Sequence, residues 1–145
     1  MAPDAPAPTR GVTARTEQQR LGDAGEDAVA THLVALGWQI LARNLHVGRG
    51  EIDLLAVDPG PPRQLVVVEV RWRARRDFGL PEETVTWRKQ RGLRRAFGRL
   101  VEAGRLPDGG RLPALPIRID VIAVEPGVGA DVPHRIRHHR SAVSG

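Results

Sequence analysis

The chain has 145 residues, of which 22 are basic and 17 acidic, and it carries a net charge of +5. This length suits a single compact domain of about 100–150 residues and is too short for two enzyme domains. The absence of cysteine excludes disulfides, thiol catalysis and cysteine-bound zinc or iron–sulfur centres. Apolar runs reach only four residues, so we expect no membrane span, and without a signal-peptide pattern the expected location is the cytoplasm.

The first half of the chain predicts one helix and three strands. Residues 1–16 are rich in Pro and Ala and predict a disordered leader. Apolar residues then recur at helical spacing over 17–36, and Gly37 is typical of a helix C-cap. The strands are expected at 38–42, 51–57 and 64–72, with turns at 44–50 and 58–62. The last strand is nearly continuous in Val and Leu, which indicates a central position with both faces covered.

The second half predicts a helix and one further strand. Thr86 is the expected N-cap of this helix, whose apolar side is opposed by a ridge of arginines. A strand is expected at 117–124, and the Gly, Pro, His and Arg residues of 126–145 predict a disordered basic tail. The expected fold is therefore α/β, with αβββαβ order and a mixed central sheet flanked by helices, over residues 17–125.

Charge is divided unevenly along the chain. Residues 21–70 contain seven acids and three bases, whereas residues 71–105 contain eleven bases and four acids, and 21 of the 22 basic residues are Arg. Basic side chains can hold a phosphate backbone while acids bind the divalent metal that attacks it, so this division suits a nuclease. A second interpretation stays open, in which a GC-rich genome has replaced Lys by Arg on an ordinary solvated surface.

Three carboxylates interrupt the apolar strands. Alternation along a strand places Glu51 and Asp53 on one side, and Glu69 on the same side as Arg71. A buried carboxylate needs a strand end, an Arg partner or a shared cation. We favour a cation, because Mg²⁺ commonly takes one or two protein carboxylates and completes its shell with water and phosphate oxygens. The pattern thus predicts a Mg²⁺ (or Mn²⁺) site for phosphodiester hydrolysis.

Several short motifs carry a family resemblance. They are Gly-Glu-Asp at 25–27, Gly-Trp at 37–38, Arg-Asn at 43–44, Gly-Glu-Ile-Asp-Leu at 50–54, Val-Glu-Val-Arg-Trp-Arg at 68–73, Lys-Gln-Arg at 89–91 and Ile-Asp-Val at 119–121. Over residues 20–125 the chain resembles the YraN-type uncharacterised bacterial family. That family is similar to archaeal Holliday-junction resolvases of the restriction-endonuclease-like superfamily, whose signature is an Asp and then Glu-x-Lys on the next strand. The resemblance implies a restriction-endonuclease-like core and DNA as the substrate, with a role in recombination or repair. Because those resolvases act as dimers, the resemblance also leaves a homodimer open.

The resemblance also implies roles for particular residues. By position in the signature, Asp53 and Glu69 are the metal ligands, Glu26 approaches the metal from the first helix, and Arg71 stands in the place of the Lys. Second-tier candidates are Glu51, Lys89 and Gln90. Nucleic-acid contacts are expected from the arginines that follow the acidic site, namely Arg73, Arg75, Arg76, Arg88, Arg91, Arg94 and Arg95.

The Arg at position 71 changes the expected chemistry. A lysine can lose its proton when its pKa is depressed, whereas arginine stays protonated and can only clamp a phosphate. We therefore predict a nucleic-acid-binding protein whose Mg²⁺-dependent endonuclease activity on structured or branched DNA is reduced or absent, unless Lys89 supplies the amine. The alternatives are a non-catalytic nucleic-acid-binding or scaffold module with a degenerate site, and an adaptor whose arginines contact an acidic protein.

Overall fold

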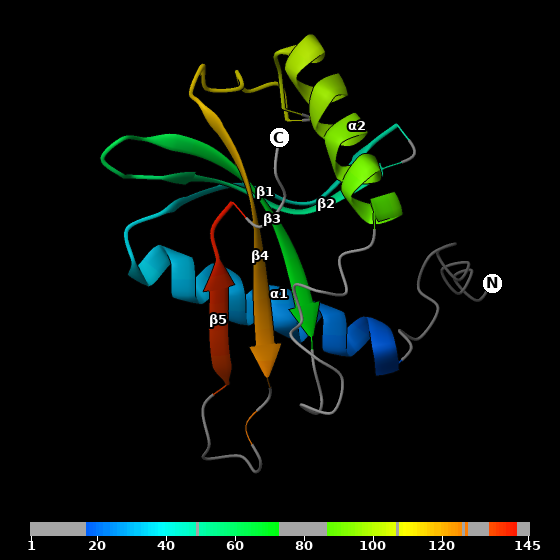
Figure 1. Cartoon of the computed structure of the whole chain (residues 1–145), viewed down its shortest axis with the longest axis vertical. Helices are drawn as coiled ribbons and strands as arrows, with labels where there is room; N and C mark the ends of the chain where they lie inside the picture. The colour runs from blue at the N-terminus through cyan, green and yellow to red at the C-terminus, as the bar shows by residue number, and fades with distance from the viewer. Residues whose placement is uncertain are drawn as a thin grey trace, which may run out of the picture.

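The computed structural model describes residues 17–48, 50–72, 87–106, 108–125, 127 and 134–141. In chain order the elements are α1 (Glu17–Ala35), β1 (Gln39–Val47), β2 (Gly50–Asp58), β3 (Gln64–Trp72), α2 (Trp87–Ala103), β4 (Ile117–Glu125) and β5 (Arg135–His139). Figure 1 shows α1 running across one side of the sheet and α2 lying at the upper right. Neither helix, within the described residues, combines the length and apolarity that crossing a bilayer requires.

The five strands form one mixed sheet in the order β1-β2-β3-β4-β5. Neighbouring strands are antiparallel except β3 and β4, which are parallel and are separated in the chain by α2. A parallel pair requires such a crossover, whereas the antiparallel pairs close through shorter connections. The predicted α/β class, with a mixed central sheet flanked by helices, is therefore confirmed, and it is compatible with a nuclease-like core.

Two apolar clusters cover the two faces of the sheet. On one face α1 packs Val29 and Leu33 against side chains that include Val66 and Val68. On the other face α2 packs Leu93 and its apolar neighbours against side chains that include Leu55, Leu65 and Val67. Strand β3 is buried on both sides, as its continuous Val and Leu run predicts.

A glycine sets how closely α1 approaches the end of β3. A Cβ atom built on Gly25 would lie 2.9 Å from Cε3 of Trp72, a separation that real side chains do not tolerate. The helix can therefore rest directly on the indole. This contact places Glu26, the next residue of α1, over the part of the sheet that carries the predicted carboxylates.

The first strand is longer than predicted. The turn expected at 44–50 is wrong for most of its length, because β1 continues to Val47 and pairs with β2 as far as Val47↔Gly50. Asn44 lies within the strand at a φ of +50°, a left-handed conformation that Asn tolerates better than most residues. This Asn has the local preference of a turn residue, although the ladder continues past it.

The expectation of a disordered tail over 126–145 is wrong for residues 135–139, which form the edge strand β5 against β4. Arg137 Nη2 lies 2.9 Å from Glu125 Oε1, so charge as well as the ladder holds this strand. The predicted leader at 1–16 and the expected N-cap Thr86 lie outside the described residues.

Candidate functional site

Asp53 and Glu69 lie on neighbouring strands where the β2–β3 ladder reaches its end. The register runs from Asp58↔Gln64 to Leu54↔Val68, and these two carboxylates come next on their strands. Asp53 Oδ2 accepts a 2.8 Å hydrogen bond from the backbone N–H of Val70. The Asp53 side chain therefore replaces a ladder partner and is held against β3 beside Glu69, whose relative exposure is only 2%.

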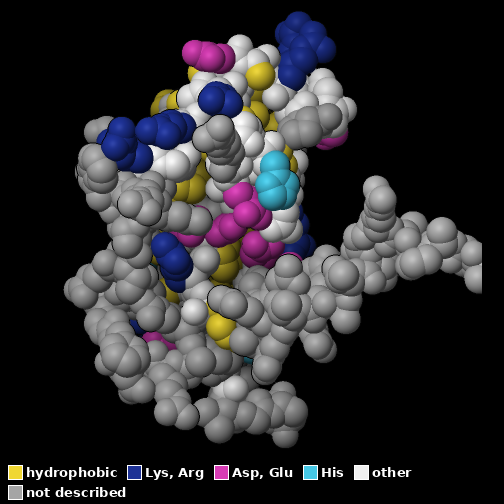
Figure 2. All heavy atoms as spheres, turned by 90° about the vertical axis from the view of Figure 1, so that its right-hand side faces the viewer, with side chains coloured by type: hydrophobic (Ala, Val, Ile, Leu, Met, Phe, Trp, Pro, Cys, Tyr) yellow, Lys and Arg dark blue, Asp and Glu magenta, His cyan; other side chains and the backbone are white. Residues whose placement is uncertain are grey.

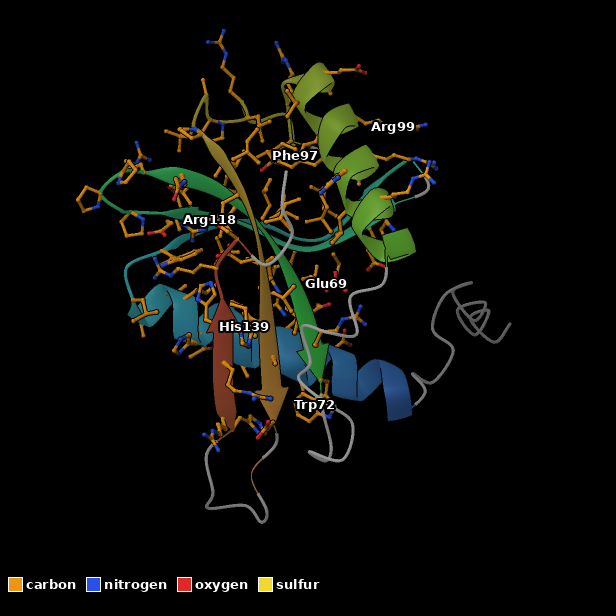
Figure 3. All side chains as sticks on the ribbon, in the orientation of Figure 1. Glu69, Trp72, Phe97, Arg99, Arg118 and His139 are labelled. Carbon is orange, nitrogen blue, oxygen red and sulfur yellow. The ribbon has the colours of Figure 1, made fainter. Side chains whose placement is uncertain are left out.

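Arg71 lies next to Glu69 on the same strand, as alternation along β3 predicts. Its Nε atom is 3.7 Å from Glu69 Oε1, and its side chain is about a quarter exposed. In Figure 3 Glu69 lies on β3 in the region between the two helices. The Arg71 guanidinium offsets part of the cost of burying the Glu69 charge, and its partial exposure leaves it within reach of a bound anion.

Glu26 enters the same region from α1. Burial raises its pKa above the usual 4.5, and the negative charges of Asp53 and Glu51 raise it further. A hydrogen bond from Asn44 and the charge of Arg43 lower the pKa but do not cancel this increase. Its Oε2 atom is buried and has no hydrogen-bond partner among the described residues. Negative charge therefore exceeds local compensation around this side chain, a condition that a bound cation would relieve.

The carboxylates fit a metal that needs few protein ligands. Among the described side chains, no three His, Asp or Glu residues are grouped so that they could hold an ion together. Mg²⁺ does not require such a cage, since one or two carboxylates with water and phosphate oxygens satisfy its octahedral shell. Asp53 and Glu69 are the pair that the structure brings to neighbouring strand positions, and the Glu26 carboxyl on α1 lies close enough to Asp53 for the two charges to interact.

The structure describes the side chains of only some of the other predicted site residues. Glu51 is exposed on β2, and Arg91, Arg94 and Arg95 are exposed on α2. Figure 2 shows carboxylates in magenta gathered at mid-height on this face, with dark-blue basic side chains on the upper part, where α2 lies. The side chains of Lys89 and Gln90 lie outside the described residues, as do Arg73, Arg75, Arg76 and Arg88, so the approach of Lys89 to Glu69 stays a prediction.

A second buried charge cluster, which the sequence analysis missed, is centred on Asp120 of β4. Asp120 is fully buried, and Arg118 donates to both of its oxygens through Nε at 2.8 Å and Nη2 at 2.9 Å. His138 Nε2 lies 2.7 Å from Oδ2, and the backbone N–H of Ser141 donates to Oδ1 at 2.9 Å. Burial alone raises the pKa of Asp120, but these hydrogen bonds and the Arg118 charge hold it below 3.8.

Arg118 extends this cluster to the opposite end of the β2–β3 ladder from Asp53. Its Nη2 donates to Asp58 Oδ2 at 2.9 Å and its Nη1 to Gln64 Oε1 at 2.6 Å, while the guanidinium lies over Trp38 at 5.5 Å. Figure 3 labels Arg118 on the side of the sheet away from α2. The signal in the sequence was an Arg and an Asp two residues apart in an otherwise apolar strand, together with His138 in the supposed tail.

Comparison with known proteins assigns the family. Residues 25–124 match the model of uncharacterised protein family UPF0102. A UPF0102 protein of Symbiobacterium thermophilum is 46% identical over 110 residues, covering 75% of this chain and 85% of the relative. Relatives from Roseiflexus castenholzii and Mycobacterium sp. strain KMS are 39% identical over 111 residues (77% of this chain, 83% of the relative) and 44% identical over 107 (74% of each). The matched segment contains strands β1 to β3 and α2 in full, β4 except for Glu125, and α1 from Gly25 onward. The chain therefore belongs to the UPF0102 family.

Proposed function

We propose that this protein binds structured or branched DNA and that Asp53 and Glu69 hold a Mg²⁺ or Mn²⁺ ion at the bound backbone. The observation that carries the proposal is the meeting of these two carboxylates on neighbouring strands, with Asp53 fixed by the Val70 amide. Their order, an Asp and then Glu-x-Arg on the next strand, resembles the Asp and Glu-x-Lys signature of the restriction-endonuclease-like superfamily. The exposed arginines of α2 supply the positive charge that a phosphate backbone requires.

Each side chain has a distinct role in this proposal. Asp53 and Glu69 supply oxygen ligands, and Glu26 adds negative charge from α1 that favours cation binding. A bound ion would polarise the scissile phosphate and acidify a water molecule. Arg71 can donate two parallel hydrogen bonds to a phosphate and stabilise its developing charge.

Arg71 also supports a second function, DNA binding without efficient cleavage. A guanidinium donates hydrogen bonds and does not act as a base, so Arg71 can orient a phosphate beside Glu69 but cannot activate water. The protein would then act as a binding or scaffold module that retains the acidic site. Both functions require DNA binding, and they differ in whether metal produces a cleaved product.

A binding and cleavage panel tests the proposal. Single-stranded, duplex, flapped and four-way DNA are incubated with the full chain in Mg²⁺, Mn²⁺ or EDTA, beside Asp53→Asn, Glu69→Gln and the control Asp108→Asn. Asp108 is an exposed acid in the loop after α2, far along the chain from the site. Metal-dependent cleavage that Asp53→Asn and Glu69→Gln abolish and Asp108→Asn retains supports the enzyme.

The same panel separates the alternatives. Tight binding without cleavage in any metal supports the binding module. DNA binding should weaken with salt, with a log–log slope of about −0.9 for each duplex phosphate neutralised. A wild-type protein with no salt-dependent affinity for any of the four DNA forms refutes both functions and favours an acidic protein partner.

A further inference from the structure

A small pocket lies where the β1–β2 hairpin meets α2. Its volume is about 150 Å³, and it is lined by Val47, Gly50, Gly92, Arg95, Ala96 and Arg99. Since a water molecule takes about 30 Å³ of liquid volume, the pocket can hold a small polyatomic anion with some of its water. None of the carboxylates of the candidate metal site lines it.

Contacts between the hairpin and the helix define the pocket floor. A Cβ atom built on Gly50 would lie 2.8 Å from Ala96 Cβ and 3.3 Å from the Gly92 carbonyl oxygen, so the two backbones touch here. A Cβ atom built on Gly48 would overlap the guanidinium of Arg99, which places that cation directly over the hairpin turn. Figure 3 shows Arg99 on the side of α2 that faces the hairpin.

The charge of the pocket is positive. Arg95 and Arg99 lie one helical turn apart and are both exposed, and neither guanidinium has an ion-pair partner within the described part of the chain. Two like charges at this spacing repel each other and disfavour the helix. An anion bound between them would replace that repulsion with two charge-assisted contacts.

Packing does not explain why residue 92 is a glycine. It lies inside α2, where glycine weakens a helix relative to alanine, yet a Cβ atom built on it would meet nothing within 4 Å. Gly98 in the same helix also has open space around a built Cβ atom, but it does not line the pocket. Of these two glycines of α2, Gly92 is the one at which a methyl group would reduce the space available to a ligand in the pocket.

We propose that this pocket binds a phosphate group, with Arg95 and Arg99 as its cationic donors and Gly92 as the residue that keeps it open. The inference rests on the proposed function, because it assigns the phosphate to the backbone of the bound nucleic acid. Gly50 precedes Asp53 by three residues on β2, a distance of about 10 Å along an extended strand. One strand of backbone can therefore reach both the pocket and the carboxylates.

Matched variants of the full chain test the pocket. We compare Arg95→Gln/Arg99→Gln and Gly92→Ala with Gly98→Ala, a helix glycine outside the pocket, and Arg111→Gln, an exposed Arg after α2. Four-way DNA binding is measured over a salt series by fluorescence anisotropy. Gly92→Ala should weaken binding about tenfold, the double variant should also flatten the salt slope by about 0.9, the value for the one phosphate that the pocket holds, and both controls should match wild type. Circular dichroism checks that all variants are folded.

A second measurement identifies the source of the phosphate. Inorganic phosphate is titrated into labelled protein while the amide signals of Gly50 and Gly92 are followed by NMR. Shifts that saturate in wild type but not in the double variant support a phosphate site. If wild type also binds no DNA, the proposed function is refuted while the phosphate site stands. Saturable shifts with unchanged DNA affinity in Gly92→Ala and the double variant overturn the nucleic-acid assignment and leave free phosphate. No shifts and no change in DNA affinity overturn the pocket while leaving DNA binding intact.

Discussion

Replacing Asp120 by Asn should destabilise the fold strongly, although the change only replaces one carboxylate oxygen by an NH₂ group. Asp120 is fully buried and accepts hydrogen bonds from two Arg118 nitrogens and from the backbone of Ser141, with His138 2.7 Å away. The NH₂ group of Asn would take the place of one of the two acceptor oxygens and would face N–H groups that can only donate. Arg118, whose side chain is 9% exposed, then loses one of the two carboxylate charges that pair with it.

The expected loss is about 3–5 kcal/mol in the free energy of unfolding, the range for removing one partner of a buried ion pair. Asp58 still accepts a hydrogen bond from Arg118 at 2.9 Å, which places the loss toward the lower end, about 3 kcal/mol. In a domain of about 100 residues, 1 kcal/mol shifts Tm by about 4–8 °C, so the variant should melt about 12–24 °C below wild type.

The pH dependence gives the sharper test. Burial opposes the shift, but the hydrogen bonds from His138, Arg118 and Ser141 lower the pKa of folded Asp120 below 3.8. Folding is therefore stabilised above pH 3.8, and this contribution is lost as pH falls through the pKa of the folded state. Urea unfolding of wild type and Asp120→Asn should give a large difference at pH 7 that narrows below about pH 4. A difference under about 1 kcal/mol, or one independent of pH, would refute the reasoning.

Three further variants probe the site and α2. Arg71→Lys should raise Mn²⁺-dependent cleavage of four-way DNA by roughly 100-fold, the low end of an acid–base contribution, and equal rates would contradict the role given to the guanidinium. Burial and then the charge of Asp53 raise the pKa of Glu26, so Glu26→Gln should stabilise the fold in urea at pH 7; this advantage should shrink as pH falls through the raised pKa of the folded state and be gone below about pH 4.5. Gly98→Ala should raise the free energy of unfolding by about 1 kcal/mol, since its methyl meets only open space; a destabilised variant would mean that α2 packs differently there.

Much of the fold could be predicted because periodicity and burial agree along most of the chain. Strand β3 begins and ends where its Val and Leu run predicts, and Gly37 follows α1 with a φ of +88°, as a C-cap does. Strand β5 could not be predicted, because four of its five residues are Arg or His. It forms because β4 offers an open edge and the carboxylates of Glu125 and Asp120 meet its basic side chains.

The sequence predicted the neighbouring strand positions of Asp53 and Glu69 better than it predicted what surrounds them. Alternation identified the Glu69–Arg71 contact, because it depends on one strand. The approach of Glu26 depends on how closely α1 packs at Gly25, which is a tertiary contact with Trp72. The hydrogen bond from Val70 to Asp53 depends on the end of the ladder, which periodicity does not locate.

The two ends of the β2–β3 ladder use buried carboxylates in opposite ways. At one end Asp58 accepts hydrogen bonds from Gly60 and Arg118, and although burial opposes it, these contacts lower its pKa. At the other end burial and neighbouring acids raise the pKa of Glu26, and one of its oxygens has no hydrogen-bond partner among the described residues. Satisfied carboxylates stabilise a fold, whereas an excess of negative charge lowers stability unless a cation binds. This contrast within one sheet is the physical reason why we propose a ligand site at the end that carries Asp53 and Glu69 and a structural role for the Arg118 cluster.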